Sequence, residues 1–221
     1  ERDVDDWCFL LARTDPAVPK HKGLSAFAVP MHQRGIEQRP LRMINGITKE
    51  FGQVIFDGAR VPAENMLGAP GEGWRIAMTI VSHEREPGEV GYVARYAKTV
   101  KDLEKTVRAN PAAFRNDQRD GVAWAYVQAE MLRLHVRRRL SERLDGPDHG
   151  PGGSIDKLLM TWVEQSVGTA ALDLAGSGAV IDGEDVALKI YLYSRAQSVM
   201  GGTSQIQKNI IATRILGLPT A

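Results

Sequence analysis

The sequence predicts an α+β fold that is mostly α: the second half of a β-domain over residues 1–70, then an antiparallel four-helix bundle over 71–221. Two observations predict this division. Short apolar or alternating runs separated by turn residues fill the first part, which is typical of a small antiparallel sheet. From Gly71 onward the apolar residues recur with a period of about 3.6 instead of two, as in amphipathic helices.

Four strands are expected in the first part of the chain. Residues 7–12 form a short apolar run suited to a buried strand, and a polar loop containing Pro16 and Pro19 follows it. Residues 24–29 alternate and stop at Pro30, and further strands are expected over 35–39 and 51–56. Together they indicate a partial antiparallel sheet or barrel.

The second part predicts long helices with short connections, which indicates an antiparallel bundle. The first covers about 74–108, with a perturbation near Pro87, and the second covers about 117–144. A glycine- and proline-rich linker (146–153) then leads to a helix over 154–175, with Ser154 as its cap, and a fourth helical segment spans about 184–199. In the second helix the residues expected inside are Val122, Tyr126, Met131, Leu134 and Val136.

Composition excludes several function classes. Hydrophobic residues make up 43% and charged residues 25% of the chain, and the net charge is +1, so neither nucleic acid nor an anionic membrane is an expected partner. The basic run 133–143 is interpreted as the solvated face of a helix. The five histidines lack metal-ligand spacing, and no apolar run is long enough to span a membrane. We therefore expect a soluble, cytoplasmic protein without a metal.

The most informative stretch is M-G-G-T-S-Q-I-Q-K-N-I-I-A-T-R-I-L-G-L-P, residues 200–219. Thr203 is a plausible helix N-cap, and Gln207 lies close to the reach-back position of a capping box. The two preceding glycines allow close approach to the backbone, so the turn could present N–H groups to an anionic or polar ligand. An ordinary capped helix is the alternative interpretation.

This stretch closely resembles the carboxy-terminal signature of the acyl-CoA dehydrogenase family of flavoproteins. The resemblance implies that Thr203 and Gln205, with the turn glycines Gly201 and Gly202, contact FAD. The segments D-W-C-F-L-L-A-R-T, G-L-S-A-F-A-V-P and F-D-G-A-R-V-P-A-E-N-M-L-G also resemble the second half of the family's middle β-domain. The family's amino-terminal helical domain has no counterpart here, which implies that the chain is the carboxy-terminal part of a longer protein.

The family reaction requires a carboxylate that removes the α-proton and a flavin that accepts the β-hydride. The family's usual base is a Glu directly before the G-T of this turn, where the present chain has Gly201. A subset of the family places its Glu on the first bundle helix instead. Alignment of G-W-R-I-A-M with that subset implies Glu84 as the base and Arg85 as a substrate-binding residue. Glu86 is the competing carboxylate, and a surface role for Glu84 is the alternative.

Two segments depart from the family pattern. The family's R-x-x-F-G, which reaches the flavin of a neighbouring subunit, is represented by R-A-N-P-A-A-F-R at 108–115. Its Q-x-x-G-G-x-G is reduced to L-D-L-A-G-S-G at 172–178, without the glutamine. These changes favour either a divergent subgroup or a heteromer in which only some sites hold FAD. Lys157 resembles a lysine usual at that helix start, although a surface position near the cap is expected for it.

The resemblance implies FAD-dependent conversion of an acyl-CoA thioester to a trans-2-enoyl-CoA. Electron-transfer flavoprotein would be the electron acceptor, and the protein would form a homo- or hetero-oligomer, either a dimer or a tetramer. Two alternatives stay open: a non-catalytic or FAD-poor assembly subunit, and a flavin oxidase or monooxygenase on the same fold.

Overall fold

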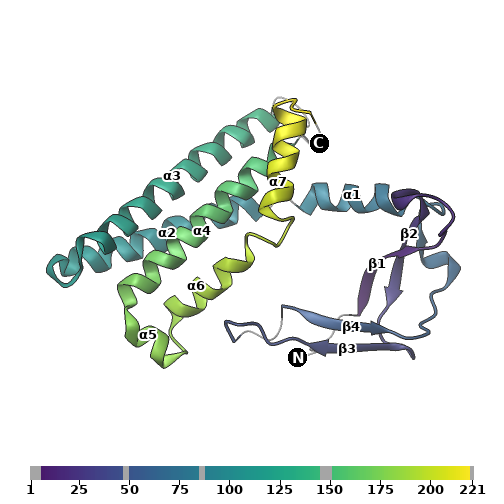
Figure 1. The fold of residues 1–221 in the computed structure, drawn as a ribbon, viewed down its shortest axis with the longest axis horizontal. Coiled ribbons are helices and arrows are strands. Elements are labelled where there is room, and N and C mark those ends of the chain that lie inside the picture. Colours follow the sequence, from purple (N-terminus) through teal and green to yellow (C-terminus); the bar gives the residue numbers. More distant parts are fainter. Residues whose placement is uncertain (1–5, 47–49, 85–87, 145–150, 220–221) are drawn as a thin grey trace. The chain divides into compact units, whose positions relative to one another are not determined.

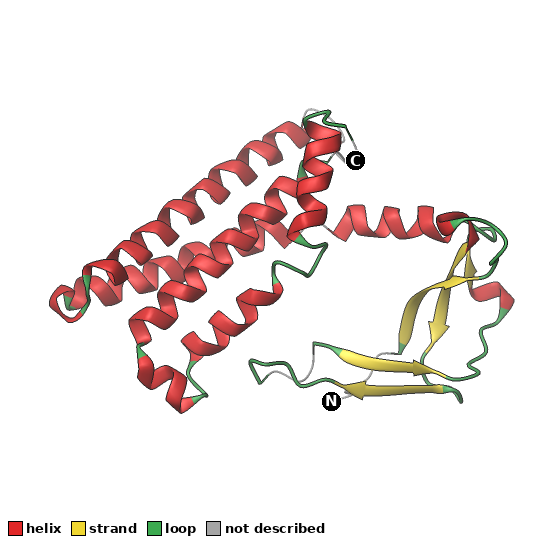
Figure 2. Cartoon of the chain, in the orientation of Figure 1, coloured by secondary structure: helices red, strands yellow, loops and turns green. Residues whose placement is uncertain are grey.

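The computed structural model describes residues 6–46, 50–84, 88–144 and 151–219, with only the backbone described at 82–84, 88–89 and 143. The chain divides into two compact units, residues 1–84 and 85–221. The first contains every strand of the described residues, and the second contains a bundle of long helices (Figures 1 and 2). The predicted α+β, mostly α fold is therefore confirmed. The domain boundary placed after residue 70 stays a prediction.

Two small antiparallel sheets make up the first unit. Strands β1 (Trp7–Arg13), β2 (Leu24–Pro30) and β5 (Met66–Leu67) form one sheet in the order β1-β2-β5. Strands β3 (Ile36–Pro40) and β4 (Gly52–Phe56) form the other. The four strands expected from the sequence are present, whereas the two-residue β5 is too short to give a period-2 signal.

Helix α1 (Gly73–Glu84) packs against β2 in the same unit. Its start requires glycine, because a Cβ at Gly73 would lie 2.6 Å from the carbonyl carbon of Ser25. The hydroxyl of Ser25 is fully buried, accepts a hydrogen bond from Gly71 N at 3.1 Å, and lies 2.7 Å from the hydroxyl of Thr14. This network fixes the chain between the sheet and α1.

The second unit is helical throughout. Helices α2 (Gly88–Ala109), α3 (Asn116–Leu144), α4 (Gly153–Ala175) and α6 (Val186–Ala196) are its long elements. Short α5 (Ser177–Asp182) follows Gly176, whose φ is +74°, and has too few residues to give a periodic signal in the sequence. Helix α7 (Ser204–Ile210) continues into a π-helical turn at Ile211–Ile215. The helix predicted over 74–108 corresponds to α1 and α2, which flank residues outside the described range.

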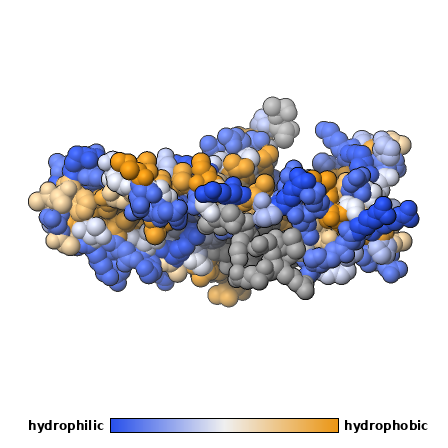
Figure 3. Space-filling view, turned by 90° about the horizontal axis from the view of Figure 1, so that it is seen from below, coloured by the Kyte–Doolittle hydropathy of each residue, from blue (hydrophilic) through white to orange (hydrophobic). Residues whose placement is uncertain are grey.

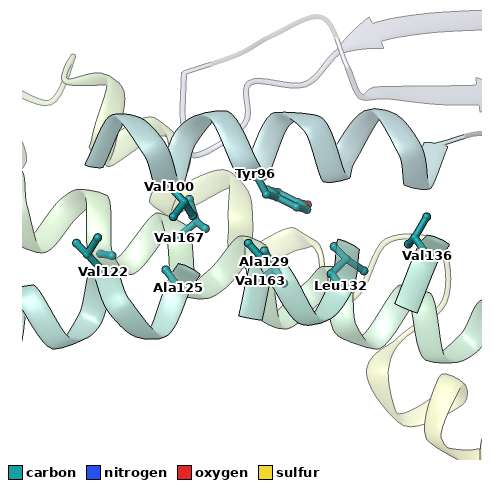
Figure 4. Close-up of a cluster of buried hydrophobic side chains, with 10 residues drawn as sticks. Tyr96, Val100, Val122, Ala125, Ala129, Leu132, Val136, Val163 and Val167 are labelled. Carbon is teal, nitrogen blue, oxygen red and sulfur yellow. The ribbon is translucent and has the colours of Figure 1, made fainter. Parts of the chain in front are cut away.

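The core of the bundle is built where α2, α3 and α4 meet (Figure 4). Small residues on α3, among them Ala125 and Ala129, allow its neighbours to approach closely. The buried members of this cluster are Tyr96, Val100, Val122, Ala125, Ala129, Leu132, Val136, Val163, Val167 and Ala170.

Helix α3 carries apolar residues on two faces, and only one faces the bundle core. Val122 and Val136 are buried as predicted, but Tyr126, Met131 and Leu134 are each more than half exposed, so their predicted burial is wrong. Apolar side chains also reach the surface of the helical unit on the face that Figure 3 shows. Along α3 the exposed stripe has spacings of three or four residues, which is one side of a helix, and comprises Trp124, Val127, Met131 and Leu134.

The start of α4 is held by buried charge rather than by the predicted cap. Ser154 lies inside the helix, and its buried hydroxyl has no partner among the described residues, so its predicted capping role is wrong. Asp156, which is fully buried, lies 3.3 Å from Nε of Arg139 and 2.6 Å from Nε2 of His135. Arg139, from the basic run expected in solvent, is therefore only 7% exposed.

Candidate functional site

The turn between α6 and α7 has the backbone conformation that its two glycines make possible. Gly201 and Gly202 have φ values of +62° and +93°, a region that residues with a Cβ rarely adopt. The amide of Met200 still bonds to the carbonyl of Ala196 at 2.9 Å, and Ser204 N bonds to Ser198 O at 2.9 Å. The chain therefore leaves α6, reverses over the glycines and enters α7 within a few residues.

Thr203 caps α7, as predicted: its hydroxyl oxygen accepts a hydrogen bond from Ile206 N at 3.2 Å. The hydroxyl hydrogen stays available for a ligand. Within the described ranges, no backbone or side-chain acceptor takes the N–H groups of Gly201, Gly202 or Thr203. Gln205 is exposed at the start of α7. Three amides and one hydroxyl can thus donate to a polar or anionic group at this turn.

Gln207 supports the turn from inside, in a way that differs from the predicted capping box. Its fully buried side-chain amide nitrogen donates to the carbonyl of Gly201 at 2.8 Å and lies 3.5 Å from that of Gly202. A Cβ at Gly202 would lie only 2.7 Å from the same nitrogen. Alanine at 202 would therefore combine an unfavourable φ with displacement of a buried side chain.

Lys157 supports the other end of the turn, and its predicted surface position is wrong. The side chain is buried near the start of α4, with the residue only 7% exposed. Its Nζ donates to Thr161 Oγ1 at 3.2 Å and to the carbonyl oxygen of Gln197. Burial lowers the pKa of this ammonium group. The sequence contained the lysine, but the partner that defines its environment lies 40 residues further along.

The structure does not test the predicted base. Glu84 is the last residue of α1 and its side chain is not among those described; Arg85 and Glu86 lie outside the described residues. The predicted FAD contacts Gly201, Gly202, Thr203 and Gln205 do lie together in one turn. Their roles in binding, and those of Glu84 and Arg85 in catalysis, stay predictions.

A second polar cluster, which sequence reasoning missed, joins α2 to α4. The carboxylate of Glu164, 4% exposed, accepts hydrogen bonds from the hydroxyl of Tyr96 and, at 2.7 Å, from Arg95. The Arg95 guanidinium also lies over the ring of Tyr92, 4.7 Å from its centroid. The only signal for this cluster in the sequence is a glutamate within the apolar pattern of α4.

Removal of the Tyr96 hydroxyl should make the free energy of unfolding depend less on pH above pH 10. Burial, and then the negative charge of Glu164, raise the pKa of Tyr96 well above that of an ordinary tyrosine. The unfolded chain releases this proton first, near pH 10. The stabilisation that the protonated Tyr96 hydroxyl gives the folded state is therefore complete below pH 10 and is lost as the pH rises further. The free energy of unfolding of Y96F should be about 1 kcal/mol lower than that of wild type at pH 7. Above pH 10 it should fall less steeply with pH than that of wild type.

Urea unfolding between pH 7 and 11 would measure both effects. Y126F is the matched control, because Tyr126 on α3 is more than half exposed, and it should follow the wild-type profile. Parallel profiles for Y96F and wild type above pH 10 would contradict the expectation.

Two further classes of site have no support in the described part of the chain. No three His, Cys, Asp or Glu side chains within it are grouped closely enough to bind a metal ion. None of the helices in the same ranges is both long and apolar enough to cross a lipid bilayer.

Comparison with known proteins identifies relatives over nearly the whole chain. Residues 71–216 match the carboxy-terminal domain of acyl-CoA dehydrogenases. Acyl-CoA dehydrogenase IpdE1 of Mycobacterium tuberculosis is 37% identical over 221 residues, covering 98% of this chain and 56% of that protein. Human mitochondrial short-chain specific acyl-CoA dehydrogenase is 28% identical, covering 94% of this chain and 51% of that protein. The chain thus spans about half the length of these curated relatives.

Among solved structures, the Tcur3481-Tcur3483 steroid ACAD (acyl-CoA dehydrogenase) superimposes on this chain with a TM-score of 0.82 at 25% sequence identity. The match covers 98% of this chain and 57% of that chain. The likeness therefore includes both the strands of the first unit and the helices of the second.

Proposed function

Because the chain belongs to the acyl-CoA dehydrogenase family, we propose that it is part of an FAD-dependent enzyme that oxidises an acyl-CoA thioester to a trans-2-enoyl-CoA. The observation that carries the proposal is the turn of Gly201, Gly202 and Thr203, whose N–H groups have no acceptor among the described residues and whose threonine hydroxyl hydrogen is available to a ligand. FAD would supply the acceptor for the hydride that leaves the β-carbon.

The residues present in the turn fit such a cofactor. Positive φ at both glycines exposes the backbone without side chains in the way, and the buried Gln207 amide holds their carbonyls on the inner side. Gly201, Gly202, Thr203 and Gln205 would hold the flavin through hydrogen bonds. The chain's own part at this turn is to bind and orient, because it contains no carboxylate that could serve as a base.

Glu84 would remove the α-proton of the substrate through a carboxylate oxygen, and Arg85 would contact the substrate. The support is the exchange between two positions: glycine is present at 201, where the family's usual base would be, and glutamate is present at 84, the last residue of α1. Because the α-proton of a thioester is only very weakly acidic, a base that removes it works best when it is desolvated and close to its target. Electron-transfer flavoprotein would then reoxidise the enzyme.

A multisubunit assembly is part of the proposal. Trp124, Val127, Met131 and Leu134 form an exposed apolar stripe along one side of α3, and contiguous exposed apolar surface is typical of protein–protein interfaces. The related steroid ACAD carries a name that joins two proteins, Tcur3481 and Tcur3483. We therefore favour a hetero-oligomer acting on a bulky, steroid-like acyl group over a homo-oligomer acting on a simple short chain.

The second candidate is an assembly subunit that holds no FAD of its own. It is favoured by the altered segments at 108–115 and 172–178, where the family's cross-subunit flavin contacts would lie. A flavin oxidase or monooxygenase is less favoured, because such an enzyme would not require Glu84.

The test is an anaerobic titration of the full-length protein, purified with any partner subunit. Acyl-CoA thioesters of short, long and steroid-derived acyl groups are added while the flavin absorbance near 450 nm is recorded. Bleaching by a thioester supports the dehydrogenase, and the most effective acyl group identifies its substrate class. A protein that takes up no FAD would favour the assembly subunit. Rapid oxygen consumption in a parallel aerobic assay with the same thioesters would favour the oxidase.

A further inference from the structure

Lys157 is a buried positive charge whose described partners are all neutral. Its Nζ donates to the Gln197 carbonyl and to the Thr161 hydroxyl, and neither of these described partners carries a charge. An unpaired buried ammonium normally destabilises a fold, and a hydrophobic side chain of similar volume is usually at least as stable in its place. Packing alone therefore does not account for a lysine here.

The position of this charge is next to the turn that carries the free N–H groups. Gln197, which ends α6, is 3% exposed, and its carbonyl oxygen accepts from both Lys157 and, at 3.1 Å, Thr161. At the other end of the turn, a Cβ on Gly201 would lie 4.0 Å from Lys157 Cε. The lysine side chain thus lies next to both ends of the turn, at Gln197 and at Gly201.

We propose that Lys157 is a positioning residue of this turn, and that its buried charge favours a negatively charged group of the ligand bound there. The inference rests on the proposed FAD function and adds a residue to the same site. Thr161 contributes the second hydrogen bond that orients the Gln197 carbonyl, but it carries no charge. Replacement of Lys157 therefore removes a charge, whereas replacement of Thr161 removes hydrogen bonds and keeps that charge.

The experiment compares K157M with wild type in two measurements on the full-length protein. The first is thermal unfolding of the FAD-free form, and the second is FAD affinity, followed by quenching of flavin fluorescence. We expect the FAD-free form of K157M to be as stable as wild type or more so, because a desolvated charge is removed. Its FAD affinity should fall about 10-fold to 100-fold, the range for a lost charged hydrogen-bonding group.

K189M is the matched control, because Lys189 forms a surface ion pair with Glu184 on the same helical unit. It should leave FAD affinity unchanged. T161V keeps the ammonium group but removes the hydroxyl that donates to Gln197 and accepts from Lys157. Its FAD affinity should therefore fall less, roughly 2-fold to 10-fold.

A K157M protein that is less stable but binds FAD as tightly as wild type would overturn the proposal and assign Lys157 a purely structural role. If K157M does not fold, T161V decides: unchanged FAD affinity in that variant also overturns it. Failure of the proposed function is visible separately, because wild type itself would then bind no FAD, and the inference would fall with it.

Discussion

Replacing Glu84 with glutamine should leave FAD bound and slow reduction of the flavin by an acyl-CoA thioester about 10²-fold to 10⁴-fold. Glutamine has nearly the size of glutamate but cannot accept the α-proton at neutral pH. Anaerobic stopped-flow absorbance of the bound flavin measures this step directly. Substrate affinity should change much less than the rate, because only proton transfer is removed.

Glu86 provides the matched control, since E86Q makes the same chemical change two residues further along. E86Q should reduce its flavin at close to the wild-type rate. Equal rates in E84Q and wild type would remove Glu84 from the mechanism. A larger loss in E86Q than in E84Q would instead identify Glu86 as the base.

The largest expected effect on stability is that of D156N, at the start of α4. Asparagine removes the negative charge that compensates Arg139, whose side chain is only 8% exposed, and that also faces His135. Removal of one partner from a buried ion pair typically costs 3–5 kcal/mol, and we expect about 3 kcal/mol here. The lower end applies because Glu142 lies 3.9 Å from Arg139 and can compensate part of its charge.

Urea unfolding of the full-length protein at pH 7 measures this loss. D102N is the control, because Asp102 forms an exposed ion pair with Lys98 on α2, and such pairs contribute little to stability. If D156N were no less stable than D102N, the cluster at the start of α4 would not hold the bundle together.

The sequence predicted those parts of the fold that depend on local pattern. The strands at 7–13 and 24–30 and the helices α3 and α4 were found within a few residues, because their apolar periods are regular. The Thr203 cap was also predicted, since capping depends on residues only three positions apart.

The errors share a different physical origin: contacts between residues far apart in the chain. The environment of Lys157 depends on Gln197, and that of Arg139 depends on Asp156, so local pattern placed both basic residues in solvent. Likewise, periodicity shows that α3 has apolar residues but not which face meets the core, which explains the wrong prediction for Met131 and Leu134. For the same reason the turn could be predicted from its glycines, whereas its buried supports could not.

The apolar stripe on α3 also has a consequence for the life of the protein in the cell. A newly made chain with Trp124, Val127, Met131 and Leu134 uncovered presents the kind of surface that chaperones and proteases recognise. Copies made in excess of whatever covers α3 would aggregate or be degraded. In the proposed hetero-oligomer, the amount of this protein that accumulates should therefore depend on the supply of the other subunit as much as on its own rate of synthesis.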